Sequence, residues 1–107
     1  MPYIVRNRLY EEFGRRLRDL RLGRSKPMTQ AGLGSLVGLS RTSITNIEMG
    51  RQQVSLHHLY RIAAALGIEP DQLLPAHSSQ DVKELARELL SDKEPGLAEW
   101  TDALEIR

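Results

Sequence analysis

Residues 28–50, MTQAGLGSLVGLSRTSITNIEMG, constrain the fold of this chain more than any other stretch, because they predict two short helices joined by a tight turn. Thr29 can cap the first helix, since its hydroxyl can accept from the unpaired N–H groups of the opening turn. The apolar residues that follow share one helix face: Leu33, Leu36 and Val37. Gly38 stands where the chain must turn sharply, and glycine adopts a positive φ without steric cost.

The second helix of the pair, residues 40–49, has an apolar side and a polar side. Ser40 can cap it, and Ile44, Ile47 and Met49 are expected to point inward. The polar and small residues are left outside: Arg41, Thr42, Thr45 and Asn46. A helix-turn-helix unit presents a surface of this kind to the major groove of DNA.

The spacing TQ-x-x-L-x-x-x-x-G-L-S-x-x-x-I-x-x-x-E-x-G resembles the Xre/Cro-type helix-turn-helix family, which includes the phage repressors. The downstream run LHHLYRIAAALGIEPDQLL, Leu56 to Leu74, is similar to the closing helices of that family. The resemblance covers Glu11 to Leu74. Gly32 and Gly34 depart from it, because the family more often has a polar residue and Ala at these positions.

Three side chains on the second helix are candidate base readers. Arg41 can donate two hydrogen bonds to guanine O6 and N7, and Asn46 can pair with adenine N6 and N7. Thr42 offers a hydroxyl and a methyl group, the latter suited to thymine. The resemblance also places these three residues toward base edges. Contacts to the phosphate backbone, or bracing of the helix, are expected from a second set: Gln30, Ser40, Ser43, Thr45 and Arg51.

Glu48 needs a different interpretation, because a carboxylate beside DNA would repel the phosphates. In the family a Glu at this position faces an Arg on the first helix, and the resemblance implies Arg21 as that partner. We therefore expect Arg21 and Glu48 to form a structural ion pair that ties the second helix of the motif to the first helix of the domain.

The rest of the chain predicts an all-α fold. A first helix is expected from Arg8 to Leu22, on the apolar face formed by Leu9, Phe13, Leu17 and Leu20. Ser55 can cap a fourth helix whose apolar stripe is Leu56, Leu59, Ile62, Ala63 and Leu66. A short fifth helix carries Leu73 and Leu74. This gives an N-terminal arm over residues 1–7 and a five-helix, phage-repressor-like domain over residues 8–75.

Residues 76–107 form a C-terminal extension of different character. The first 75 residues contain 11 Lys and Arg against 6 Asp and Glu, whereas the remaining ones contain 4 against 8. A basic body suits binding to an anionic partner, and the acidic remainder suggests another task. The extension predicts amphipathic helices with an apolar stripe, composed of Val82, Leu85, Leu89, Leu97, Trp100 and Leu104. This stripe can pack on its own domain, on a second copy of the chain or on another protein.

Composition excludes several classes of function. The chain has no Cys, so disulfides, thiol catalysis and Cys-ligated zinc are ruled out. No apolar run approaches the roughly 18 residues of a membrane span, and no signal-peptide core precedes the first helix, so a cytoplasmic protein is expected. His57 and His58 are adjacent and have no evident third ligand, so neither a metal nor a cofactor is expected. No catalytic constellation is present, so an enzyme is not expected.

We therefore expect a sequence-specific transcriptional regulator, most simply a dimeric repressor on a pseudo-palindromic site in double-stranded DNA. Two linked copies multiply the specificity of one short recognition helix. One alternative is an antitoxin that represses its own operon and binds a toxin through residues 80–107. Another is a protein-interaction module that has kept the fold and lost DNA binding.

Overall fold

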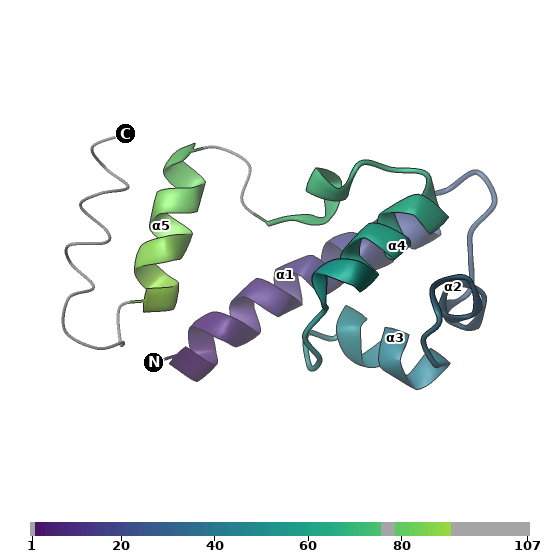
Figure 1. Cartoon of the computed structure of the whole chain (residues 1–107), viewed down its shortest axis with the longest axis horizontal. Coiled ribbons are helices and arrows are strands. Elements are labelled where there is room, and N and C mark those ends of the chain that lie inside the picture. Colours follow the sequence, from purple (N-terminus) through teal and green to yellow (C-terminus); the bar gives the residue numbers. More distant parts are fainter. Residues whose placement is uncertain (1, 76–78, 91–107) are drawn as a thin grey trace. The chain divides into compact units, whose positions relative to one another are not determined.

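The computed structural model describes residues 2–75 and 79–90, and every regular element within these ranges is helical (Figure 1). In chain order, these elements are α1 (Pro2–Leu22), α2 (Gln30–Val37), α3 (Arg41–Glu48), α4 (Leu56–Leu66), the 3-10 helix η1 (Pro70–Leu73) and α5 (Ser79–Leu90). The predicted all-α fold class is confirmed. Asn7–Pro75 form one compact unit, and α5 belongs to a second unit, which is described separately below.

Side-chain caps define where three of these helices begin. The Thr29 hydroxyl accepts from the Gly32 N–H at 2.9 Å, and the Ser40 hydroxyl accepts from the Ser43 N–H at 3.0 Å. Ser55 accepts from the N–H of His58 at 3.0 Å in the same way. Each bond satisfies one of the N–H groups that a helix start leaves unpaired. The three predicted caps are therefore present.

Gly38 makes the turn between α2 and α3. Its φ is 76°, a left-handed conformation in which a side chain would be strained. The following N–H, of Leu39, donates to the Gly34 carbonyl at 2.9 Å and closes the turn. Ser40 then caps α3 directly, so only three residues separate the two helices. This short connection produces the helix-turn-helix geometry that the sequence predicted.

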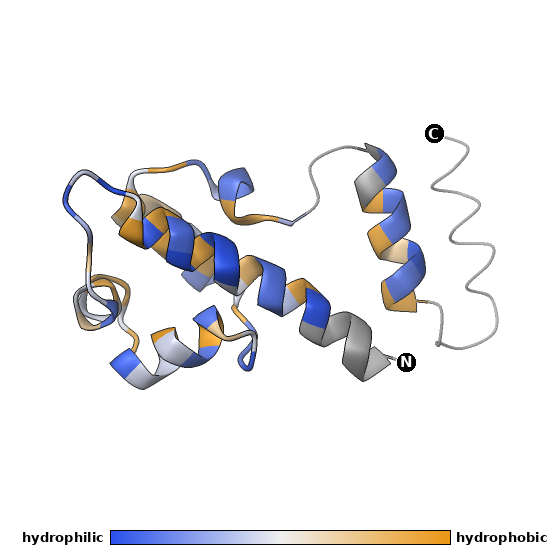
Figure 2. Ribbon diagram, turned by 180° about the vertical axis from the view of Figure 1, so that it is seen from behind, coloured by the Kyte–Doolittle hydropathy of each residue, from blue (hydrophilic) through white to orange (hydrophobic). Residues whose placement is uncertain are grey.

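The core of residues 7–75 is formed by apolar side chains from all five of its helical elements. Its buried members are Phe13, Leu17, Leu33, Val37, Ile44, Ile47, Ile62, Ala63, Leu66 and Leu73. The surface of α1 that faces the viewer in Figure 2 is mostly hydrophilic, as expected for a helix that packs with one side only. The described part of the chain contains no helix with the length and apolar character of a membrane span.

Two leucines that the sequence placed in the core are exposed instead. Leu36 is 57% exposed, because α2 turns Leu33, Gly34 and Val37 toward the domain and leaves Leu36 at the edge of that arc. Leu56 is 69% exposed, because it is the first residue of α4 and lies one turn before the stripe that is buried. A helical period identifies a face, but it does not show how far the partner surface extends along it.

The first helix starts earlier than predicted. α1 begins at Pro2 and not at Arg8, so the segment predicted as an N-terminal arm is helical from Pro2 onward. Proline is favoured at the first position of a helix, where its missing N–H has no partner to lose. No further proline and no glycine interrupts the chain before Gly14.

The predicted fifth helix is a single 3-10 turn, in which the Glu69 N–H donates to the Gln72 amide oxygen at 3.0 Å.

The described part of the extension is α5, which lies in the segment predicted to form amphipathic helices. Val82 is 48% exposed, and the other apolar residues of this helix are half-buried: Leu85, Ala86, Leu89 and Leu90. The amphipathic character expected of this segment is present in α5. The remaining predicted members of its apolar stripe lie outside the described residues, namely Leu97, Trp100 and Leu104.

Gly14 determines how closely α1 approaches the end of α3. It is buried in the middle of α1, and a Cβ at this position would lie closer than 3.0 Å to the carbonyl oxygens of Ile47 and Glu48. Carbonyls at a helix end are backbone atoms and cannot rotate away as a long side chain would. The missing side chain therefore allows direct contact between α1 and the C-terminal end of α3.

We expect Gly14→Ala to lower the free energy of unfolding by roughly 1–3 kcal/mol, the usual effect of overpacking a tight interface. Helix propensity alone predicts the opposite sign, since alanine is favoured over glycine inside a helix by about 0.5–1 kcal/mol. Urea denaturation of the variant and the parent chain separates the two effects. A variant more stable than the parent would show that α1 and α3 are not in direct contact here.

Candidate DNA-binding surface

Arg21 of α1 and Glu48 of α3 form a two-pronged salt bridge inside the domain. The Arg21 Nε donates to Glu48 Oε2 at 2.6 Å, and Nη2 donates to Oε1 at 2.9 Å. The two residues are only 6% and 8% exposed. The third guanidinium nitrogen, Nη1, donates to the Met28 carbonyl at 2.8 Å, just before α2. One arginine therefore connects α1, the start of α2 and the end of α3, and the predicted pair is present.

Gln30 extends this network across α3. Its amide nitrogen donates to Glu48 Oε1 at 2.9 Å, and its amide oxygen lies 2.9 Å from the Thr45 hydroxyl, which donates to it. Since the two ends of the amide have different partners, the side chain has one preferred orientation. The Thr45 hydroxyl also lies 3.0 Å from the Arg41 carbonyl of its own helix. The polar groups of Gln30 and Thr45 therefore brace α3 against α2.

The outer side of α3 carries the three predicted base readers. Arg41 and Thr42, in the first turn, are exposed, and Asn46, one turn later, is half-buried. The opposite side of the helix is buried through Ile44, Ile47 and Glu48. The structure thus places the three candidates together on one exposed surface, whereas it turns the carboxylate of Glu48 inward.

The remaining candidates for backbone contacts occupy the two ends of α3. Ser40 and Ser43 lie at its start, where their hydroxyls are 3.2 Å apart and Ser40 serves as the cap. Arg51 is exposed just beyond the other end, and its N–H donates to the Asn46 carbonyl at 2.8 Å. A helix start is a favourable place for an anion, because its N–H groups point outward. The two ends of α3 therefore offer polar groups on either side of the three predicted base readers.

Several other cations of the domain already have partners. Arg15 and Arg16 both pair with Glu12 on the surface of α1, and the hydrogen bond from Arg15 holds the pKa of Glu12 below its ordinary value. One carboxylate balances only one of the two arginine charges, so this cluster on α1 keeps a net positive charge. Arg24 donates to the Leu66 carbonyl at 2.9 Å and caps the end of α4.

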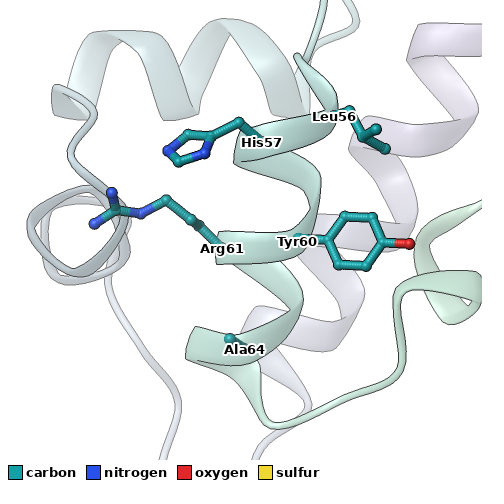
Figure 3. Close-up of a pocket in the computed structure, with 5 residues that line it drawn as sticks. All are labelled: Leu56, His57, Tyr60, Arg61 and Ala64. Atoms are coloured by element: carbon teal, nitrogen blue, oxygen red, sulfur yellow. The ribbon is translucent and has the colours of Figure 1, made fainter.

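The exposed face of α4 carries a shallow hollow of about 580 Å³ (Figure 3). His57 and Arg61 point to one side of it, and Arg61 lies 3.4 Å from the Leu36 carbonyl of α2. Leu56 and Tyr60 point to the other side and are 69% and 59% exposed. Within residues 2–75 and 79–90, no three His, Asp or Glu side chains are arranged to hold a metal ion. The hollow has an apolar edge and lacks a catalytic arrangement.

Sequence reasoning missed the exposure of Met49 and the close contact at Gly14. Met49 was expected to point inward, but it is 49% exposed at the end of α3. Gly14 was not identified, although a glycine inside a helical pattern costs stability relative to alanine and can therefore indicate a packing constraint. Met49 follows Glu48 directly in the sequence. A helix that buries Ile44, Ile47 and Glu48 turns the next residue outward, and this spacing could have indicated the exposure of Met49.

Comparison with known proteins supports the helix-turn-helix fold. Residues 12–76 match the family model of a helix-turn-helix domain. The control protein C.BamHI of Bacillus amyloliquefaciens is 42% identical over 62 residues, which are 58% of this chain and 75% of that protein. The crystal structure of the restriction-modification controller protein C.AhdI from Aeromonas hydrophila has a TM-score of 0.59 and 37% identity. The match covers 64% of this chain and 96% of the C.AhdI chain.

The Arg21–Glu48 pair should show strong energetic coupling. Arg21→Met and Glu48→Leu should each lower the free energy of unfolding by about 3–5 kcal/mol, because each leaves a buried charge without its partner. The double variant leaves no charge and should be more stable than the sum of the two losses implies. Denaturant unfolding of the four proteins measures the coupling, and strictly additive losses would contradict it.

Proposed function

The chain belongs to the Xre-type helix-turn-helix family of DNA-binding regulators, and from this membership we propose that it is a dimeric repressor that reads the major groove with α3. Its operator is pseudo-palindromic, and the genes that it controls belong to a restriction-modification system. The observation that carries this proposal is the exposed surface of Arg41, Thr42 and Asn46 on a helix whose opposite side is buried. Because the relatives of this chain are DNA-binding regulators, we propose no enzymatic activity for it.

Base recognition follows from the positions of these three side chains. Arg41, in the first turn of α3, is the bidentate donor to a guanine, the commonest specific contact in the major groove. Asn46 pairs with an adenine, and the Thr42 methyl group packs on a thymine. Because the buried side of α3 is locked to α1 and α2, the three groups approach DNA as one rigid set. Preorganisation of this kind lowers the entropy lost on binding.

Contacts to the phosphates set the orientation of α3 in the groove. Arg51 neutralises a phosphate at one end, and Ser40 and Ser43 donate to another at the helix start. Gln30 and Thr45 serve as braces, since their polar groups already bond to each other and to Glu48 or the helix backbone. These roles divide the candidates of the second set into anchors that touch DNA and braces that do not.

The restriction-modification assignment rests on the two relatives. Both are named as control proteins, one of them explicitly of restriction-modification, and they share 42% and 37% identity with this chain. The matched part of the chain is the helix-turn-helix domain, which contains every side chain proposed to touch DNA. A repressor of this type blocks transcription by occupying a site that RNA polymerase needs.

Dimerisation is proposed through the extension. Val82 of α5 is 48% exposed, and a self-complementary contact with a second chain buries an amphipathic helix of this kind economically. C.AhdI is covered over 96% of its length by 64% of this chain, so about a third of this chain has no counterpart there. The exposed Leu56 and Tyr60 on α4 are the alternative dimer surface. A toxin bound to the extension is the second candidate function, favoured by the same unmatched segment.

Selection of bound sequences from random duplexes tests the function directly. We expect a symmetric preferred site, and an affinity that falls with salt with a log–log slope of roughly −4 to −8 for a dimer.

Arg41→Ala should lose about 1–3 kcal/mol of binding free energy on that site and relax the preference at one base pair per half-site. Arg51→Ala is the matched control and should weaken all duplexes about equally. An unchanged preference after Arg41→Ala would contradict the assignment of α3, and a slope near zero on every duplex would contradict DNA binding.

A chain ending at His77 should stay folded, since residues 7–75 contain their own core. It should become monomeric and bind its operator much more weakly, because two half-sites about one DNA turn apart are then read separately. Sedimentation of the full and shortened chains measures this change. A shortened chain that remains a dimer would assign self-association to Leu56 and Tyr60. A full-length monomer at tens of micromolar would instead favour a missing partner such as a toxin.

A further inference from the structure

Met49 is a large apolar side chain on an otherwise polar surface. It is 49% exposed, whereas the other apolar residues of the α3 segment, Ile44 and Ile47, are fully buried. The sequence suggested a third core residue here, but α3 buries Ile44, Ile47 and Glu48 and not Met49. The exposure of Met49 therefore results from the packing of α3 and needs an explanation of its own.

The helical period places Met49 within the proposed base-reading surface. At about 100° per residue, position 49 falls between Thr45 and Thr42 when α3 is viewed along its axis. Arg41 and Asn46 lie at the two edges of the same arc. Met49 is thus at the centre of the exposed arc around the helix, one turn beyond Thr45 along it.

The backbone holds Met49 in a defined position. Its N–H donates to the Thr45 carbonyl at 3.1 Å, and the N–H of the next residue, Gly50, donates to the Ile47 carbonyl at 3.1 Å. The carbonyls of Ile47 and Glu48 pack directly on α1 at Gly14. The end of α3 is therefore anchored to the domain, while the Met49 side chain extends from a fixed Cα.

The chemistry of a thioether narrows what this side chain can contact. It has no hydrogen-bond donor, so it does not bind a phosphate as a Lys, Arg or Asn at the same place would. It is flexible and polarizable and packs well on irregular apolar surfaces. On duplex DNA the apolar surfaces within reach of a major-groove helix are the thymine C5-methyl group and the deoxyribose ring.

We infer that Met49 is a further DNA contact, which packs its thioether on an apolar surface of the operator. This inference rests on the proposed function and adds one contact to it. The contact lies beyond the base pairs read by Arg41, toward the end of α3. Its contribution is apolar, so it is insensitive to salt, unlike the contact made by Arg51.

The test uses the full-length protein and its selected operator. Met49→Ala should weaken binding about fourfold or more. The loss of one buried methylene group has an effect of about fourfold, and the loss of several has a larger one. The loss should leave the log–log salt slope unchanged. Leu22→Ala is the matched control, because Leu22 is 44% exposed on a different helix, and it should bind as the parent does. Thermal unfolding of both variants checks that the fold is retained.

Replacing operator thymines by uracil, one at a time, separates the two DNA surfaces. If one replacement weakens the parent about fourfold and leaves Met49→Ala unaffected, the contact is a thymine methyl group. If Met49→Ala loses the same affinity on every duplex, the contact is a deoxyribose. A Met49→Ala variant that binds within twofold of the parent, while Arg41→Ala binds weakly, would overturn this inference alone. Failure of the parent chain to select any sequence would overturn it together with the proposed function.

Discussion

The buried pair of Arg21 and Glu48 is the interaction on which the arrangement of the domain depends. Its guanidinium bonds to a carboxylate of α3 with two nitrogens and to the Met28 carbonyl with the third. Burying two charges costs several kcal/mol of desolvation, so such a pair adds little net stability compared with apolar residues of the same size. Its main effect is geometric, because only one orientation of α3 satisfies both groups. Gln30 and Thr45 extend this restraint to α2.

This restraint divides α3 into two sides with different tasks. The inner side holds the apolar contacts, the carboxylate and the close approach to Gly14, whereas the outer side has few internal partners. A short helix gains little stability from its own hydrogen bonds, so its position is determined by the surface on which it packs. The outer side chains can therefore serve recognition without loss of stability. Met49 is an example, since an apolar residue there contributes little to the fold.

Local features of the sequence predicted most of the helix-turn-helix unit. The caps Thr29, Ser40 and Ser55 and the turn at Gly38 depend on residues within five positions of one another, so the chain encodes them directly. The ion pair joins residues 27 positions apart and was predicted only through resemblance to a family. The start of α1 at Pro2 was missed because the apolar stripe begins at Leu9 and because Tyr3, Ile4 and Val5 are weak helix formers.

The sequence alone determined the class of the fold, the ends of α2, α3 and α4, and the residues on the outer side of α3. These properties follow from helical periodicity and from capping by neighbouring residues. Only the tertiary structure decided which apolar residues are covered. Leu36, Leu56 and Met49 are as apolar as the core residues. They are exposed because the surfaces on which their helices pack do not extend as far as these side chains. Burial depends on the shape and extent of distant segments, which no local pattern contains, and here it decided which side chains remain available for recognition.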